Sequence, residues 1–393
     1  MSSGACTVSV EQEHWNCPAP IEDLSGWLER HWEPFDPAHA QALLWPERPA
    51  RSSLSILVAG CGPNQAAVLA RTNPAARVVA TDMSGPSLTH EQHLKEKYGL
   101  TNLKLRQMPI EEVGSLGETF DLLICTSVLS HLMDARPAVR ALAGSTRPDG
   151  VIALRLPAHY ARAGIVRLQS VFTRMGLKRD AASIALARSV LEAVATDHPV
   201  RSHPAFAKDL TDAALADLFL HARTPDYTVS DCLSLAEGAG LEFQGWLCRA
   251  PYYPHDFFSG GTAGDQAIRR LPERTVWAIM EALDVANACH RFLVTPRMRP
   301  AAAYTVDFSG DGWPGYVPGL RRGCQLEGAR LSRPGLSLDL RKSRALLMGR
   351  VDGKRSIAEI VSDVGAPSGQ SVAAFFDALW KLDFLSIAKV PAR

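Results

Sequence analysis

Short apolar runs alternate with helix-like segments between residues 51 and 160 of the chain. The runs are rich in Val, Ile and Leu, and the segments between them are predicted to be helical. Strands that alternate with helices in this way predict a parallel, doubly wound α/β sheet. The predicted strands cover residues 56–59, 77–81, 103–107, 120–126 and 150–156, and the predicted helices cover residues 66–72, 88–98, 128–132 and 137–145.

The pattern changes beyond the fifth predicted strand. Residues 157–225 are rich in Ala, Leu and Arg and predict a helical insertion where the chain leaves the carboxyl end of that strand. Ligands bind at this edge of open α/β sheets. Residues 241–246 and 290–294 are the predicted sixth and seventh strands, so the sheet domain is expected to span residues 51–298.

Two further regions flank this domain. Residues 1–50 hold four of the eight tryptophans and are expected to form a lid over the ligand site, or simply to pack over the sheet. Residues 299–320 are rich in Pro and Gly, which is typical of a linker. Residues 321–393 then predict a small separate domain, with a capping-box sequence at residues 356–359.

The first apolar run ends in the glycine turn that carries the main chemical signal. Gly60-Cys61-Gly62 follows this run, and the next run ends in Asp82. A strand, a glycine turn that opens a helix, and an acid about 20 residues further on are typical of a nucleotide-binding unit. Gln65 stands where a pyrophosphate site needs a third glycine, whereas the Asp82 carboxylate suits a ribose diol. The pattern therefore predicts adenosine without phosphate, which indicates S-adenosylmethionine.

Residues 51 to about 160 resemble a class I S-adenosylmethionine-dependent methyltransferase. Residues 56–62 match the first motif of that superfamily, residues 79–82 the second, and residues 120–132 the fourth with the helix start after it. The resemblance implies a seven-stranded, mostly parallel Rossmann-like sheet and methyl transfer. Residues 221–246 also resemble a bacterial subgroup that is sometimes fused to tetratricopeptide repeats, although no such repeats occur here.

This resemblance implies a cofactor site around the glycine turn. The turn would hold the methionine part of the cofactor, and Asp82 would bind the ribose. Met108-Pro109-Ile110 stands where relatives often carry an acid near the adenine, so backbone groups and apolar packing would hold the base. The expected cofactor contacts are Ala59, Gly60, Cys61, Gly62, Asp82, Met83, Ile110, Cys125 and Thr126.

The acceptor side carries less specific signals. His131 and Asp134 follow the fourth predicted strand, and a His there can remove a proton from an alcohol or ammonium acceptor. His159 and Tyr160, just past the fifth strand, are comparable candidates, and each of the four can instead be a packing or capping residue. The expected acceptor-binding residues are Trp27 and the aromatic cluster members Tyr252, Tyr253 and His255, which can also be loop packing.

The last 70 or so residues resemble the winged-helix module of pyrroloquinoline-quinone-type leader-peptide binders, chiefly in residues 344–360. This resemblance implies a docking site for a peptide. The same unit can instead dimerise the chain or buttress the catalytic domain. Three functions therefore remain: a methyltransferase for an N or O acceptor of a small molecule, a peptide or protein methyltransferase, and a non-catalytic binder of the cofactor.

Composition narrows the partners. The chain of 393 residues carries 42 basic and 41 acidic side chains, a formal charge of +1, which gives no electrostatic reason to expect DNA or RNA. No apolar run approaches the length of a membrane span, and no signal peptide is evident, so a cytoplasmic protein is expected. Eight scattered cysteines without a C-x-x-C pair predict neither a zinc site nor disulfides.

Overall fold

The computed structural model describes residues 18–51, 53–126, 128–203, 210–220, 225–254, 262–284, 286–365 and 369–389. The chain divides into two compact units. Unit 1 comprises Met1–Glu33, Ser53–Phe243 and Glu281–Arg297, and unit 2 comprises Pro34–Ser52, Gln244–Met280 and Met298–Arg393. Within the described ranges, no helix combines the length and the apolar character that a bilayer crossing requires.

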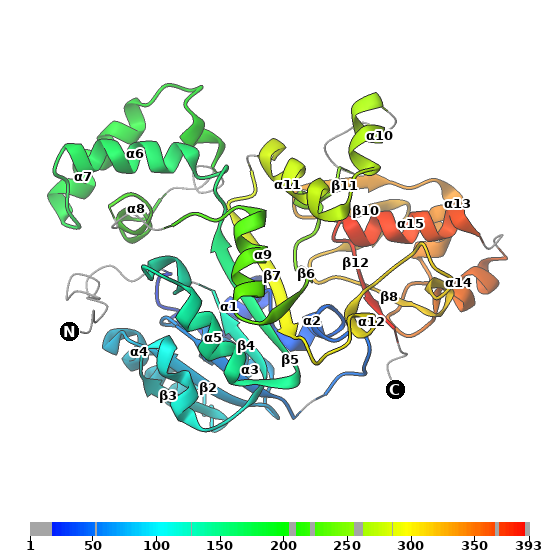
Figure 1. Cartoon of the computed structure of the whole chain (residues 1–393), viewed down its shortest axis with the longest axis horizontal. Helices are drawn as coiled ribbons and strands as arrows, with labels where there is room; N and C mark the ends of the chain where they lie inside the picture. Colours follow the sequence, from blue (N-terminus) through cyan, green and yellow to red (C-terminus); the bar gives the residue numbers. More distant parts are fainter. Residues whose placement is uncertain are drawn as a thin grey trace. The chain divides into compact units, whose positions relative to one another are not determined.

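A seven-stranded sheet forms the centre of unit 1 (Figure 1). The boundary between the two units falls within β6, the edge strand of this sheet, between Phe243 and Gln244. The strand order is β3-β2-β1-β4-β5-β7-β6. Strands β1 to β5 pair in parallel, and β7 runs antiparallel to β5. The predicted mostly parallel sheet is thereby confirmed. Its strands are β1 Ser55–Ala59, β2 Arg77–Asp82, β3 Leu103–Gln107, β4 Phe120–Cys125, β5 Thr146–Pro157, β6 Leu241–Trp246 and β7 Cys289–Pro296.

Helices cover the sheet because parallel neighbouring strands must be joined by a crossover, which is usually a helix. The right-handed sense of each crossover determines the face on which its helix lies. Helices α3 (Gln65–Thr72) and α4 (Gly85–Lys97) connect β1, β2 and β3, and they contact each other and these strands. Helix α5 (Arg136–Gly144) connects β4 to β5 and contacts α9 (Val229–Gly238). The strand order reverses between β1 and β4, and this reversal is where ligands bind in such sheets.

The helical insertion has its own apolar core. It consists of α6 (Ala163–Arg174), α7 (Ala181–Ala193), the 3₁₀ turn η4 (Pro199–Ser202) and α8 (Asp212–Phe219). Gly164 allows α6 and η4 to approach closely, because a Cβ atom at this position would lie 2.3 Å from the backbone nitrogen of Val200. The buried core residues are Ile165, Leu168, Phe172, Ile184, Ala187, Leu191, Val200, Leu215, Ala216 and Phe219.

The loop after β4 differs from the prediction. Residues 128–132 were expected to form a helix, but only the 3₁₀ turn η3 (Leu129–His131) is present. The backbone becomes extended at Leu132, and the carboxylate of Asp134 accepts a hydrogen bond from the Arg136 amide, where α5 begins. The chain therefore restarts its helix after a short exposed loop.

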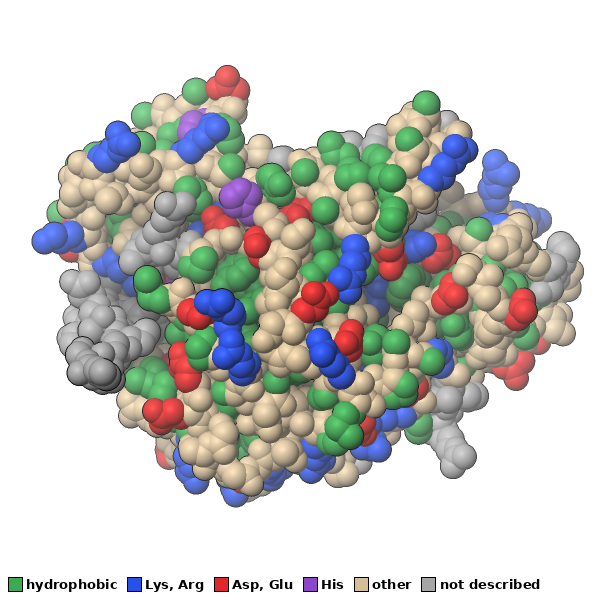
Figure 2. All heavy atoms as spheres, in the orientation of Figure 1, with side chains coloured by type: hydrophobic (Ala, Val, Ile, Leu, Met, Phe, Trp, Pro, Cys, Tyr) green, Lys and Arg blue, Asp and Glu red, His purple; other side chains and the backbone are tan. Residues whose placement is uncertain are grey.

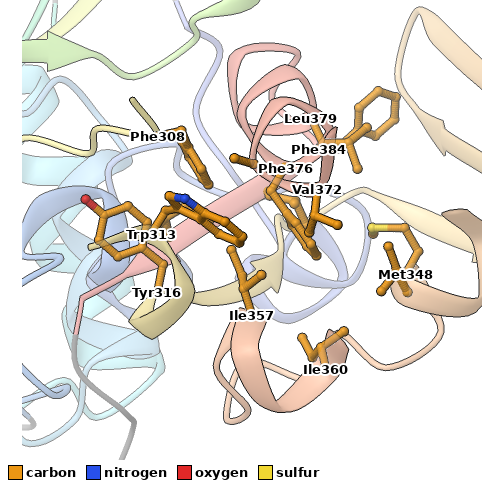
Figure 3. Close-up of a cluster of buried hydrophobic side chains, with 14 of the residues drawn as sticks. Phe308, Trp313, Tyr316, Met348, Ile357, Ile360, Val372, Phe376, Leu379 and Phe384 are labelled. Carbon is orange, nitrogen blue, oxygen red and sulfur yellow. The ribbon is translucent and has the colours of Figure 1, made fainter. Parts of the chain in front are cut away.

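Unit 2 combines small antiparallel sheets with short helices. Strand β8 pairs with β12, and β9, β10 and β11 form a second sheet. An apolar core that includes Trp313, Met348 and Phe376 lies among these elements (Figure 3). The strands are β8 Val317–Leu320, β9 Gln325–Glu327, β10 Arg330–Arg333, β11 Leu336–Asp339 and β12 Leu385–Ala388. The helices are α2 Pro37–Leu44, α10 Ala263–Arg269, α11 Glu273–Leu283, α12 Ala301–Tyr304, α13 Lys342–Met348, α14 Ile357–Val364 and α15 Gln370–Lys381. The last three residues of α11 belong to unit 1. The 3₁₀ turns are η6 Ala250–Tyr252 and η7 Trp313–Gly315. The winged-helix assignment of this part stays a prediction.

The Pro- and Gly-rich stretch 299–320 is folded into unit 2 and is not an extended linker. Phe308, Trp313 and Tyr316 are all buried in its core. Arg299 is buried and makes two hydrogen bonds to the Glu47 carboxylate, of 3.1 and 2.9 Å. Pro and Gly here form turns between buried aromatic residues, so their abundance did not indicate exposure.

The predicted lid of residues 1–50 is likewise divided. Its described residues up to Glu33 belong to unit 1, whereas α2 contacts β12 within unit 2.

Basic and acidic side chains are interspersed over the face in Figure 2, in keeping with the near-zero formal charge.

Candidate active site

Hydrogen bonds join the glycine turn after β1 to the end of β2. The amides of Gly60 and Cys61 both donate to the Thr81 carbonyl, at 2.7 and 3.1 Å. Gly60 has a φ of +72°, and a Cβ atom there would lie 1.8 Å from Val128 Cγ2. Gly62 has a φ of +57°, yet a Cβ atom there would meet nothing within 4 Å. The first glycine is therefore required by the protein's own packing, whereas the second borders open space.

Asp82 joins the end of β2 to this turn. Its Oδ2 atom accepts a hydrogen bond of 2.8 Å from the Gly62 amide, and Oδ1 accepts one of 2.8 Å from the Ser84 amide. The side chain is half-buried at the carboxyl end of the strand. Each carboxylate oxygen has a second lone pair, so these contacts leave acceptor capacity for a ligand hydroxyl.

The other predicted cofactor residues lie along the same edge of the sheet. Met83 is exposed directly after Asp82, and Ile110 is buried at the start of the 3₁₀ helix η2 (Ile110–Leu116). The Thr126 hydroxyl, at the end of β4, donates to the Gln65 side-chain oxygen over 3.1 Å. Burial raises the pKa of Cys125 to about 12, so its thiol stays protonated at neutral pH. Ala59 and Cys61 are buried, and burial also raises the pKa of Cys61.

Glu91 is a residue of this site that the sequence did not reveal. It lies on α4 with no exposed surface. Its two carboxylate oxygens accept hydrogen bonds of 2.9 Å each from the amides of Ala66 and Ala67 in the first turn of α3. Burial, partly opposed by these hydrogen bonds, raises the pKa of Glu91 to about 8. The available signal was that Ser87, Glu91 and Leu94 share one helix face, which places an acid among buried residues.

Asn64 links the glycine turn to the N-terminal segment. Its Oδ1 atom accepts from the Ile21 amide, and its Nδ2 atom donates to the Ala19 carbonyl, both over 2.8 Å. The Ile21 carbonyl also lies 3.2 Å from His90 Nε2 on α4. These contacts join residues more than 40 positions apart, and no local pattern announces them.

Trp27 lies in the helix that follows this N-terminal attachment. The helix, α1 (Leu24–Arg30), is capped by Asp23 and begins where the Leu24 amide donates to the Tyr98 hydroxyl over 2.9 Å. Trp27 is half-buried, and its ring stacks on His31 with centroids 5.1 Å apart. Its predicted contact with the acceptor stays a prediction.

The four predicted catalytic residues emerge from two neighbouring strands. His131 and Asp134 are exposed in the loop after β4, and His159 and Tyr160 are exposed after β5. Because β4 and β5 pair in parallel, both loops leave the same edge of the sheet. Asp134 accepts from the Arg136 side chain and amide, over 2.8 and 3.0 Å, and these bonds lower the Asp134 pKa. Because its pKa is lowered, Asp134 is a weak proton acceptor, which leaves His131 as the candidate base of its loop.

Tyr227 is a second residue that the sequence analysis missed. Its amide donates to the Pro157 carbonyl, and its carbonyl accepts from the His159 amide, both over 2.9 Å. Burial raises the pKa of Tyr227 to about 12, with smaller contributions from the Cys232 thiol and the Asp134 carboxylate. The Tyr227 phenol is therefore neutral at neutral pH, and the charge of Asp134 contributes to this state.

A buried pair holds the backbone of this tyrosine. His290 Nε2 lies 2.9 Å from the Tyr227 carbonyl and 3.3 Å from Glu281 Oε1. The other Glu281 oxygen accepts from the Val229 amide over 2.8 Å. Both side chains are buried, so they fix the turn that precedes α9.

The remaining acceptor-binding candidates belong to unit 2. Tyr252 is almost completely buried, and its ring stacks on Trp246 with centroids 3.9 Å apart. Tyr253 is buried, and its hydroxyl donates to Glu273 Oε1 over 2.6 Å. Both rings contribute to the packing of unit 2, which is the alternative that the sequence left open. His255 lies outside the described residues.

A family comparison supplies the identity of the sheet domain. Residues 57–154 match the family described as methyltransferase domain. This segment is therefore similar to methyltransferase domains. The methyltransferase fold predicted from the sequence is confirmed. The domain match supports the predicted S-adenosylmethionine cofactor. In the described part of the chain, no group of three or more His, Cys, Asp or Glu side chains is placed to hold a metal ion.

The curated relatives match part of the chain. An uncharacterised protein from Synechococcus sp. is 27% identical over 239 residues, which are 58% of this chain and 57% of that protein. Trans-aconitate 2-methyltransferase from Deinococcus radiodurans is 33% identical over 128 residues, which are 32% of this chain and 46% of that enzyme. The chain therefore spans about half the length of these relatives.

A solved structure resembles nearly the whole chain. PKMT2 from Rickettsia typhi aligns with a TM-score of 0.67 and 13% identity, covering 91% of this chain and 76% of that one. A second structure of PKMT2 is a complex with AdoHcy, with a TM-score of 0.64 and 11% identity. At this level of identity, the likeness shows a shared fold.

Proposed function

We propose that the chain transfers a methyl group from S-adenosylmethionine to an N or O atom of a small molecule. The observation that carries the proposal is the pairing of Gly62 with Asp82. Open space adjoins the Gly62 Cα atom, and the Asp82 carboxylate accepts a hydrogen bond from the Gly62 amide. Such a site can admit a ligand against the backbone and still offer carboxylate lone pairs to its hydroxyls.

The predicted cofactor residues have distinct roles in this proposal. The cofactor supplies a methyl carbon that is already activated by a sulfonium group. Asp82 would bind the ribose, and Met83 and Ile110 would flank the adenine. The turn from Ala59 to Gly62 would hold the methionine part, and Cys125 and Thr126 would line the remaining wall at the end of β4.

The acceptor would enter between the loops that follow β4 and β5. Methyl transfer requires the acceptor lone pair to point along the bond that breaks, so the protein must chiefly orient the acceptor. His131 would take the proton that an alcohol or ammonium acceptor loses. His159 and Tyr160 would bind the acceptor from the β5 side, and the ionised Asp134 would attract a cationic acceptor. The neutral phenol of Tyr227 would donate a hydrogen bond to the acceptor.

A peptide or protein acceptor is the second candidate, and one observation favours it. The likeness to PKMT2 extends over 91% of this chain, so it includes much of unit 2. A fold shared beyond the methyltransferase domain suits a unit that docks a substrate chain. The third candidate, a cofactor-binding protein without catalysis, would keep the Gly62–Asp82 geometry and lack an acceptor.

Incubation with methyl-labelled S-adenosylmethionine distinguishes these candidates. The full chain is offered a deproteinised metabolite extract and, separately, a protein digest from the same cells. The small-molecule proposal predicts label in metabolites that gain one methyl group. Label confined to peptides would support the second candidate, and cofactor binding with no label in either pool would support the third.

A further inference from the structure

Glu91 is a buried acid on α4 that contacts the chain just after the glycine turn. Both of its carboxylate oxygens accept amide hydrogens, from Ala66 and Ala67 at 2.9 Å each. The side chain has no exposed surface, so its oxygens are committed to these two amides.

These two amides belong to the first turn of α3, where backbone donors have no partner within the helix. Asn64, the N-cap of α3, makes no capping hydrogen bond to the helix with its side chain, because it bonds to Ile21 and Ala19. Glu91 therefore takes the place of the missing cap, from a different helix.

The start of α3 determines where the glycine turn lies. Gly62 is only three residues before Gln65, the first residue of α3. Asp82 holds the turn at the Gly62 amide, and Glu91 holds it at Ala66 and Ala67. Two carboxyl groups thus hold the turn and the helix start that follows it: Asp82 is half-buried, and Glu91 is fully buried. An eight-residue helix such as α3 has little stability of its own, so its start depends on such contacts.

We infer that Glu91 is a positioning residue of the cofactor site, which sets the place of the Gly60–Gly62 turn through the first turn of α3. It does not touch the cofactor. This inference rests on the proposed function, because it assumes that the turn binds the cofactor.

Glu91→Gln tests the inference, because an amide group brings an N–H to one of the two backbone donors. Asn102→Ala is the matched control. The Asn102 side chain donates to the carbonyls of Ala70, Asn73 and Ala76 at 3.1, 3.1 and 3.0 Å, and so holds the opposite end of α3. Both variants lose buried hydrogen bonds of the same helix, but only the first acts next to the turn.

Calorimetry with S-adenosylhomocysteine, below the melting temperature of each variant, gives the decisive readout. We expect Glu91→Gln to weaken binding about tenfold or more, and Asn102→Ala to leave the affinity within about twofold of wild type. Equal losses in both variants, or a Glu91→Gln variant that only melts earlier, would overturn the inference. If Glu91→Gln does not fold, Glu91→Asp keeps the carboxyl group on a shorter side chain and is expected to weaken binding less.

Hydrogen exchange separates this inference from the proposed function. In the protein without cofactor, amide exchange over residues 60–67 should accelerate in Glu91→Gln and stay near the wild-type rate in Asn102→Ala. If the wild type binds no S-adenosylhomocysteine, the proposed function fails, and the exchange result still decides whether Glu91 holds the turn. Unchanged exchange in Glu91→Gln would overturn the positioning role.

Discussion

Replacing Asp82 by Ala removes the carboxylate that joins β2 to the glycine turn. In the cofactor-free protein, the substitution deletes two hydrogen bonds of 2.8 Å, from Gly62 and Ser84. In the proposed complex, it also deletes the acceptor of the two ribose hydroxyls. A hydrogen bond to a charged group contributes about 1.5–3 kcal/mol, so two such bonds correspond to about 3–6 kcal/mol of binding free energy. Part of that loss is offset by water in a half-buried site.

Calorimetric titration with S-adenosylhomocysteine measures this loss. We expect the dissociation constant of Asp82→Ala to rise by at least about 100-fold. Asp121→Asn provides the control: Asp121 is a buried aspartate on β4 that accepts from the Ser55 amide and pairs with Arg147, both at the start of their strands. It should lower the melting temperature and leave the affinity unchanged. Unchanged affinity in Asp82→Ala would refute the placement of the ribose.

Three further predictions concern the turn, the buried acid and the candidate base. Gly62→Val should abolish S-adenosylhomocysteine binding in calorimetry, since its side chain would enter the open space and a φ of +57° strains a β-branched residue; binding as in wild type would place the ligand elsewhere. The pKa of Glu91, about 8 in the folded state, lies above its ordinary value of 4.5, so the native state holds this proton where the unfolded chain has lost it. Stability should therefore fall as the pH rises from about 4.5 to 8, and denaturant titrations should find this fall smaller in Glu91→Gln; an identical pH dependence would contradict the shifted pKa. His131→Ala should lower the methylation rate by roughly 10²–10⁴ if the acceptor must lose a proton, and by tenfold or less if the acceptor arrives neutral; a normal rate with a lower melting temperature would make His131 structural.

The sequence predicted the sheet and the glycine turn because their signals are local. The five buried residues of β1, the two glycines and the acid that ends β2 each follow from a short run of the chain. The open space beside Gly62 accords with the prediction that this glycine admits a ligand. Proposed roles of the site residues rest on these local signals together with the resemblance.

Glu91, Asn64 and Tyr227 were missed because their importance depends on distant backbone groups. Glu91 accepts hydrogen bonds from amides that lie 25 and 24 positions away in the sequence. Asn64 accepts one from an amide 43 positions away. Such pairings become visible only when the chain is folded. The prediction of a linker over residues 299–320 was wrong for a related reason. Pro and Gly indicate the local backbone conformation, whereas the burial of Trp313 and Tyr316 depends on contacts with other parts of unit 2.

Formation of S-adenosylhomocysteine from S-adenosylmethionine tests the central claim without knowledge of the acceptor. The full chain and its Asp82→Ala variant are incubated with the cofactor and a total cell extract that has been depleted of its own methyltransferases by heating. The account predicts that the wild type forms S-adenosylhomocysteine only when extract is present, and that Asp82→Ala forms little at the same cofactor concentration. Equal product from both proteins, or none from a folded wild-type chain, would contradict it.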